Sequence, residues 1–136
     1  MWLDALDRQK IVELAYQKGK ELTLANENYL LWLEAFFEKE YRDDVGAGDI
    51  TSTAVLVKNK SRKAFLKAKQ AGVIAGIEEV SWFLRRHSLE VKVCIKDSKQ
   101  VLSGETVMEI QGTQKDILAT ERIALNVLQR MSGIAT

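Results

Sequence analysis

Three polar side chains near the end of the chain have the types and the spacing to bind an anion. Arg122, Asn126 and Gln129 fall on one narrow stripe when residues 120–136 are plotted as a helix at about 100° per residue. An arginine presents a planar set of donors that matches a carboxylate or a phosphate in two places at once. The stripe is therefore a candidate site for an anionic small molecule. The solvated face of an ordinary amphipathic helix gives the same pattern and is the more frequent case.

Glu121 makes this helix less ordinary, because it lies inside the apolar arc between Ile117 and Leu128. An ionised carboxylate in apolar surroundings costs several kcal/mol unless it is paired. We therefore expect a partner for Glu121. That partner either orients the helix or the Arg122 guanidinium, or forms a salt bridge that only fixes the packing.

Other residue types that support catalysis are scarce. Cys94 is the only cysteine and His87 the only histidine, which excludes an internal disulfide, a multi-cysteine zinc site and a paired nucleophile and base from within this sequence. Asp43, Asp44 and Asp49 could suggest a metal cluster, but acidic residues are also common at helix ends. We predict no metal ligand among them.

Length and composition indicate a single soluble domain. The 136 residues are 46% hydrophobic and 29% charged, with a formal net charge of +1. So balanced a charge does not favour binding to nucleic acid or to a membrane surface. No apolar run approaches the ~20 residues of a membrane span, and the expected location is the cytoplasm.

Hydrophobic periodicity predicts helices at residues 3–20, 28–41, 78–87 and 114–131, and strands at residues 52–57, 63–69, 73–75, 90–96 and 106–110. Asn26 is placed to cap the second helix, and Gly46 to end it. Strands and helices segregate along the chain instead of alternating strictly. This order predicts the α+β class, with an antiparallel sheet, helices packed on one face and an N-terminal helical extension.

Four segments together resemble one known family. The run ERIALNVLQRMSGIAT at residues 121–136 closely resembles the ER-x-x-L-N-x-L-x-x-x-SGIAT signature of quinolinate phosphoribosyltransferase, also called nicotinate-nucleotide pyrophosphorylase. Three further segments agree in order and spacing: DDVGAGDIT at residues 43–51, KAKQAGVIAG at residues 67–76 and TVMEIQG at residues 106–112. The resemblance covers roughly residues 40–136.

The resemblance implies a defined reaction. The family is a glycosyltransferase (pentosyltransferase) of NAD biosynthesis that joins quinolinate to phosphoribosyl pyrophosphate and yields nicotinate mononucleotide, pyrophosphate and carbon dioxide, with magnesium neutralising the pyrophosphate. By this resemblance, Arg122 reaches into the barrel of a neighbouring subunit and binds a carboxylate of quinolinate. Glu121 and Asn126 match the same motif and are expected to help position it. The implied partners are the two substrates and a second copy in a homodimer or larger homo-oligomer.

The chain departs from the family by stopping at Thr136, where the family continues into a C-terminal α/β barrel. The resemblance thus identifies residues 1–136 as a single N-terminal domain, with a helical lead-in (1–41), a mixed region of strands and helix (42–112) and the signature helix (113–136). The barrel is absent from the chain. No catalytic residue and no magnesium ligand are expected here, and the isolated chain is expected to be inactive.

Two alternatives remain open from the sequence. A molybdenum-transport-associated paralogue shares the family's pattern around the signature helix. A lipoyl or biotinyl carrier is the alternative from another functional class, because the strand pair within residues 91–112 resembles a carrier hairpin and Lys99 lies near a turn. Lys99 lies between Ser98 and Gln100, however, and lacks the flanking methionine typical of carriers.

Overall fold

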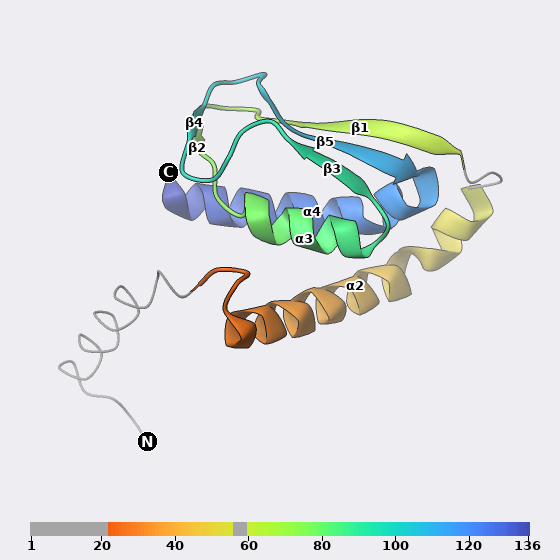
Figure 1. Cartoon of the computed structure of the whole chain (residues 1–136). Coiled ribbons are helices and arrows are strands. Elements are labelled where there is room, and N and C mark those ends of the chain that lie inside the picture. Colours follow the sequence, from red (N-terminus) through yellow and green to blue (C-terminus); the bar gives the residue numbers. More distant parts are fainter. Residues whose placement is uncertain (1–21, 56–59) are drawn as a thin grey trace. The chain divides into compact units, whose positions relative to one another are not determined.

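The computed structural model describes residues 22–55 and 60–136 (Figure 1). The helices are α2 (Glu27–Val55), α3 (Ile77–Arg86) and α4 (Gln114–Ala135), and the strands are β1 (Ser61–Lys67), β2 (Gly72–Val73), β3 (Glu90–Val93), β4 (Gln100–Val101) and β5 (Thr106–Thr113). The chain divides into two compact units at the boundary between Ala35 and Phe36. The helix expected at residues 3–20 lies outside the described residues. None of the described helices is both long and apolar enough to cross a membrane.

The described part of the first unit contains the start of α2. The Asn26 side-chain oxygen accepts hydrogen bonds from the backbone N–H groups of Asn28 and Tyr29, at 3.0 and 3.3 Å. These bonds satisfy donors that a helix start leaves unpaired, so the predicted cap is confirmed. One turn further on, the rings of Tyr29 and Trp32 stack with their centroids 6.1 Å apart.

Helix α2 extends further than the sequence predicts. The pattern ends the helix at residue 41, places a terminator at Gly46 and starts a strand at residue 52, whereas α2 runs to Val55. The predicted helix end and the terminator at Gly46 are therefore wrong, and so is the predicted strand over residues 52–55. The rest of that predicted strand, residues 56–57, lies outside the described residues. A glycine in a helix costs about 1 kcal/mol relative to alanine, which weakens a helix without ending it. The sequence contains no proline that would block the helix.

A three-stranded antiparallel sheet in the order β1-β5-β3 organises the second unit. Ile110 in the central strand β5 pairs with Ala64 of β1 and Val91 of β3. Because side chains alternate across a strand, these residues share one face of the sheet. Phe65, Glu109 and Lys92 form the next row and share the opposite face. This alternation gives the sheet an apolar side and a more polar side.

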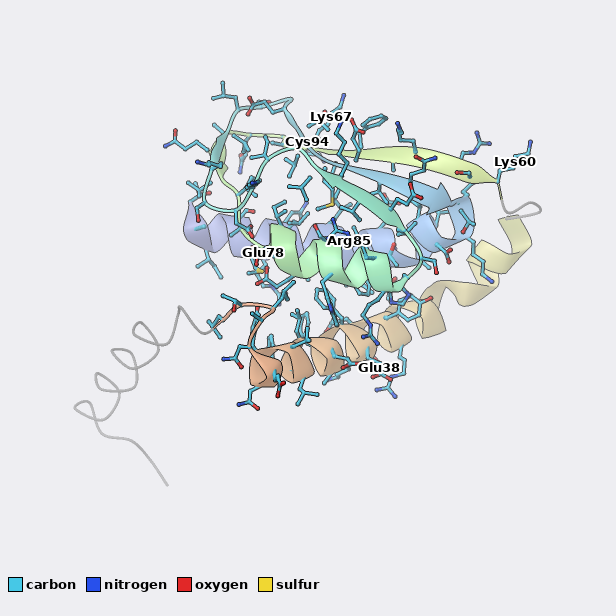
Figure 2. The ribbon with its side chains drawn as sticks, viewed as in Figure 1. Glu38, Lys60, Lys67, Glu78, Arg85 and Cys94 are labelled. Atoms are coloured by element: carbon cyan, nitrogen blue, oxygen red, sulfur yellow. The ribbon has the colours of Figure 1, made fainter. Side chains whose placement is uncertain are left out.

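Helices α3 and α4 cover the apolar side of the sheet (Figure 1). Met108 and Ile110 of β5 are 0% and 4% exposed, while Phe65 on the other side is 50% exposed. Arg85 of α3, which is labelled in Figure 2, also contacts the sheet. Its Nη2 donates a hydrogen bond to the Val91 carbonyl of β3 at 3.3 Å. The predicted α+β class, with an antiparallel sheet and helices on one face, is confirmed.

A second, two-stranded sheet joins β2 to β4, with Gly72 opposite Val101 and Val73 opposite Gln100. The sequence did not predict β4, since two residues are too few to show an alternating pattern. Backbone hydrogen bonds from Ile74 N–H to Lys99 and from Ser98 N–H to Ile74 continue the pairing past the strand ends.

Candidate functional site

Helix α4 carries the residues predicted to bind an anion. A side-chain cap at its start and a buried apolar face fix its position. Its N-cap is Thr113, whose hydroxyl accepts a hydrogen bond from the Asp116 N–H at 3.1 Å. Its buried face is apolar apart from one threonine and comprises Thr120, Ile123, Ala124 and Leu128. The Thr120 hydroxyl donates to the carbonyl of Asp116 at 2.7 Å, so it stays satisfied within the helix. The opposite face of α4 is therefore free to present polar side chains.

Arg122, Asn126 and Gln129 all lie exposed on that opposite face. The predicted stripe is confirmed as a geometric feature. Arg130 is exposed on the same helix. The roles assigned to Arg122 and Asn126 remain predictions, because exposure alone fits both a solvated face and a binding face.

Arg122 forms an ion pair that the sequence did not predict. Its Nη1 donates to the Asp44 carboxylate of α2 at 3.4 Å, and the two side chains are 74% and 22% exposed. Exposed ion pairs contribute about 0–1 kcal/mol to stability, so this pair adds little to the fold. The pair connects the Arg122 side chain of α4 to α2. No periodic signal connects residues 78 positions apart, and only the opposite charges in two motifs could have suggested the contact.

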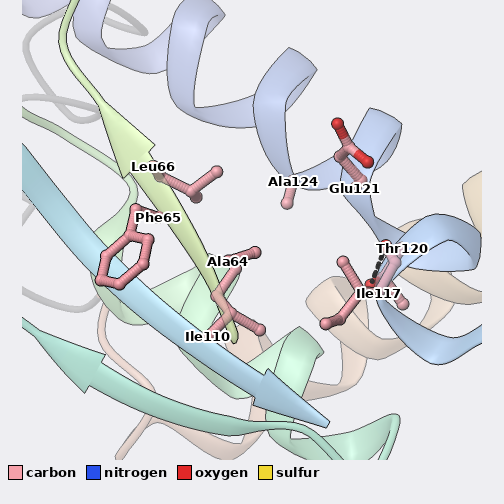
Figure 3. A pocket seen from close by; sticks show the side chains of 8 residues that line it. All are labelled: Ala64, Phe65, Leu66, Ile110, Ile117, Thr120, Glu121 and Ala124. Carbon is pink, nitrogen blue, oxygen red and sulfur yellow. Dashed lines mark hydrogen bonds between the residues drawn. The ribbon is translucent and has the colours of Figure 1, made fainter. Parts of the chain in front are cut away.

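Glu121 is exposed, and the expectation that it lies buried with a partner is wrong. One helical turn places Thr120 and Ala124 into the core and rotates Glu121 to the edge of that face, where water solvates the carboxylate. No ion pair joins Glu121 to another residue of the described part. Glu121 instead borders a pocket of about 110 Å³ between β1 and α4 (Figure 3).

That pocket is lined mainly by apolar side chains, namely Ala64, Phe65, Leu66, Ile110, Ile117 and Ala124, together with Thr120 and Glu121. Figure 3 shows the Glu121 carboxylate on the α4 side, apart from the side chains of Ile110 and Ile117. The pocket contains no cationic side chain. It is therefore not a second anion site.

Comparison with known proteins decides the family. The profile described as "Quinolinate phosphoribosyl transferase, N-terminal domain" matches residues 49–132, which include β1 to β5 and most of α4. The chain belongs to this family. The match includes Lys99 and the strands on either side of it. It therefore replaces the interpretation of this hairpin as that of a lipoyl or biotinyl carrier.

Curated relatives agree with the family assignment. The chain is 32% identical over 99 residues to a probable carboxylating nicotinate-nucleotide pyrophosphorylase of Methanocaldococcus jannaschii, covering 73% of this chain and 34% of that protein. It is 36% identical over 95 residues to a protein of the same name from Methanothermobacter thermautotrophicus, covering 70% and 34%. The chain thus spans about a third of the length of these relatives.

A solved structure agrees as well. NadC from Streptococcus pyogenes superposes with a TM-score of 0.70 at 30% identity, over 76% of this chain and 39% of that one. The described residues of the present chain form the α+β part and no α/β barrel.

Two motifs of the quinolinate phosphoribosyltransferase domain pack against each other. Ser132 of the SGIAT segment accepts a hydrogen bond from the Ala75 N–H at 3.0 Å and donates to the Ala75 carbonyl at 3.2 Å. Thr136 accepts from the Val73 N–H at 3.0 Å and donates to the Ser132 carbonyl at 2.7 Å. Two hydroxyls thus tie the end of α4 to β2 and to the segment that follows it.

Glycines make this close approach possible. A Cβ on Gly72 would lie 2.7 Å from the Thr136 hydroxyl oxygen, and one on Gly76 would lie 2.8 Å from the Met131 sulfur. Gly76 also has φ of 95°, a conformation that favours glycine. We interpret the glycines and hydroxyls of these two motifs as structural.

The remaining reactive side chains lie elsewhere. His87 packs against the rings of Tyr41 and Phe83, with centroids 4.2 and 4.8 Å away. Burial lowers the pKa of His87, Arg86 lowers it further, and Asp116 partly opposes the shift. Cys94 is exposed and directly follows β3, where its N–H donates a hydrogen bond to the Val107 carbonyl of β5. Among the described residues, neither His87 nor Cys94 forms an ion pair or a ring contact with Arg122.

Proposed function

We propose that this chain provides the N-terminal domain of an enzyme that converts quinolinate and phosphoribosyl pyrophosphate to nicotinate mononucleotide, pyrophosphate and carbon dioxide. The observation that carries the proposal is Arg122 in the family's ER-x-x-L-N pattern, 74% exposed on a helix whose other face is packed on the sheet. An exposed guanidinium on a helix that is packed against the sheet suits a residue that completes a site formed by another chain.

In this proposal Arg122 binds a carboxylate of quinolinate. Quinolinate carries carboxylates on two adjacent ring carbons, and one of these carbons is bonded to the reacting ring nitrogen. A fixed guanidinium that binds a carboxylate therefore orients the ring as well as attracting its charge. The interaction strengthens when the helix docks against a barrel, because charge-assisted hydrogen bonds are stronger away from water. Asn126 and Glu121 lie within one turn of Arg122 on α4, and we assign them supporting roles.

The site is shared between subunits in this proposal, since Arg122 reaches the barrel of a neighbour. The working form is therefore a homodimer or a larger homo-oligomer. The residues described here offer no group of three or more His, Cys, Asp or Glu side chains that could hold a metal ion. Magnesium at the pyrophosphate stays a prediction for the enzyme with its barrel, and no step is derived through the metal. The net charge of +1 gives no reason to invoke nucleic acid or membrane, and we place the reaction in the cytoplasm.

Substitution of Arg122 tests the proposal in the enzyme that joins this domain to a barrel. Arg122→Lys keeps the charge and loses the planar fork, so a charged hydrogen bond of ~1.5–3 kcal/mol predicts a loss of roughly ten- to a hundredfold in kcat/KM for quinolinate. Arg122→Ala should lose more. The KM for phosphoribosyl pyrophosphate should change little in both variants.

Arg130→Lys is the matched control, because Arg130 is an exposed arginine on the same helix. It should retain the activity of the parent enzyme. Equal losses at Arg122 and Arg130, or no loss at Arg122, would contradict the assignment. Failure of the parent enzyme to form nicotinate mononucleotide from quinolinate would contradict the proposed reaction itself.

A further inference from the structure

The ion pair between Arg122 and Asp44 joins a largely exposed donor to a more buried acceptor. Asp44 is 22% exposed and Arg122 is 74% exposed, so the carboxylate is the more restrained partner. Asp44 belongs to α2 and Arg122 to α4. The pair therefore fixes the end of one side chain relative to a second helix.

We propose that Asp44 is a positioning residue for Arg122, which holds the guanidinium in the orientation that receives a substrate carboxylate. The inference rests on the proposed function of Arg122. It adds a residue outside the span matched by the family profile, which begins at residue 49.

The geometry favours presentation of Arg122 over blockage by Asp44. Asp44 accepts from Nη1 alone. A guanidinium has five N–H donors, and the edge formed by Nε and Nη2 is left free by Asp44. A second carboxylate can bind that edge through two parallel hydrogen bonds.

Entropy supports the same assignment. An exposed arginine side chain samples many rotamers and loses that freedom when it binds a ligand. Asp44 restrains the side chain before the substrate arrives, which lowers the cost of binding. Asp44 contacts Arg122 at Nη1, so a substrate carboxylate on the other edge has the guanidinium cation between itself and Asp44. The positive charge of Arg122 offsets the repulsion between the two carboxylates.

Asp43 provides a matched control. It is the preceding residue of the same helix, carries the same charge and is exposed. Its side chain lies about 100° around the helix from that of Asp44. Changes at Asp43 and Asp44 therefore alter net charge equally, while only the change at Asp44 removes the acceptor of Arg122.

The first test measures the side chain of Arg122 directly in the 136-residue chain. The ¹⁵N–¹H signal of Arg122 Nε is identified by its loss in Arg122→Lys. In Asp44→Ala its heteronuclear NOE should fall and its exchange with water should quicken, and in Asp43→Ala both should match the parent. An Arg122 signal that is equally ordered in Asp44→Ala would overturn the proposal. Circular dichroism confirms that the variants retain the parent's secondary structure.

The second test is kinetic and uses the enzyme that joins this domain to a barrel. Asp44→Ala should raise the KM for quinolinate roughly two- to fivefold, the size expected for a partly exposed ion pair, with a smaller change in kcat. Asp44→Glu should restore part of the affinity. In an Arg122→Ala background, Asp44→Ala should have no further effect, because the residue that it positions is gone.

The outcomes separate the two proposals. An equal loss from Asp44→Ala in both backgrounds would show that Asp44 only supports the fold and would overturn the positioning role. If the enzyme does not accept quinolinate, the proposed function fails, and the NMR measurement still decides whether Asp44 orders Arg122.

Discussion

His87 links the packing of single residues to the pH dependence of stability. It lies at the C-terminal cap of α3, against Tyr41 of α2 and Phe83 of α3. Burial among these rings disfavours the charged imidazolium and lowers the pKa below the usual 6.5, an effect that Arg86 reinforces and Asp116 opposes. The folded state therefore prefers neutral His87, whereas the unfolded chain titrates near the ordinary value.

The direction of the pH effect follows from linkage. Above about pH 6.5 His87 is neutral in both states, and its contribution to stability is fully present. As the pH falls from about 6.5 through the lowered pKa of the folded state, the unfolded chain binds the proton first and stability declines. Urea unfolding at pH 7.5 and pH 5.5 should show this decline, and His87→Gln should reduce it. If the stability of His87→Gln fell with pH as much as that of the parent, the decline would come from the carboxylates and not from His87.

At the scale of single residues, the sequence correctly predicted which side chains of α4 are exposed where their angular position on the helix decides this. The exposure of Arg122, Asn126 and Gln129 follows from their angular positions on α4. The environment of Glu121 was predicted wrongly, because the boundary between a buried and an exposed face depends on how closely β1 approaches. The pairing of Arg122 with Asp44 depends on the tertiary fold, which no local pattern contains.

At the scale of elements, strongly amphipathic segments were predicted best. Helix α3 was expected at residues 78–87 and is Ile77–Arg86, and α4 was expected at residues 114–131 and is Gln114–Ala135. Strand boundaries shifted, as for β5, which was expected to end at residue 110 and ends at Thr113. The extra residues of α4 are held by hydroxyl contacts to Val73 and Ala75, which sequence periodicity does not report.

Two glycines test whether the contact between α4 and β2 is structural. Gly72→Ala should destabilise the protein, because the new methyl group would lie 2.7 Å from the Thr136 hydroxyl oxygen. Overpacking of this kind typically costs about 1–3 kcal/mol. Gly133 in the SGIAT segment has no atom within 4 Å of an added Cβ, so Gly133→Ala should be neutral or stabilise α4 by roughly 0.5–1 kcal/mol.

Chemical denaturation of both variants measures these differences. The contact between the two motifs would lose its support if Gly72→Ala were as stable as the parent. If Gly133→Ala were less stable than the parent, the backbone at this position would need the conformational freedom of glycine, although the space around it admits a methyl group. Retained stability together with lost activity in Gly133→Ala would instead indicate a functional role in the enzyme with its barrel.

At the scale of the whole molecule, the proposed function makes Arg122 part of a site that another chain completes. Arg122 is anchored on a helix packed against the sheet, and its guanidinium remains open to solvent. Because the residues described form no barrel, the chain by itself should give no nicotinate mononucleotide above a blank. One arginine cannot supply the stabilisation that charge development on pyrophosphate requires. The same arrangement predicts that Arg122 acts on a neighbouring subunit.

Mixing two inactive enzymes tests this prediction. One parent carries Arg122→Ala with an intact barrel, and the other carries an intact Arg122 with a disabled barrel. In a homodimer with random exchange, about half of the dimers contain one subunit of each kind. Each such dimer has one complete site, formed by the intact barrel of one subunit and the Arg122 of the other. About a quarter of the parental sites should then be active, measured as nicotinate mononucleotide formed after the subunits have exchanged. If Arg122 instead served the barrel of its own chain, no mixed dimer would contain a complete site, and the mixture would stay as inactive as its parents.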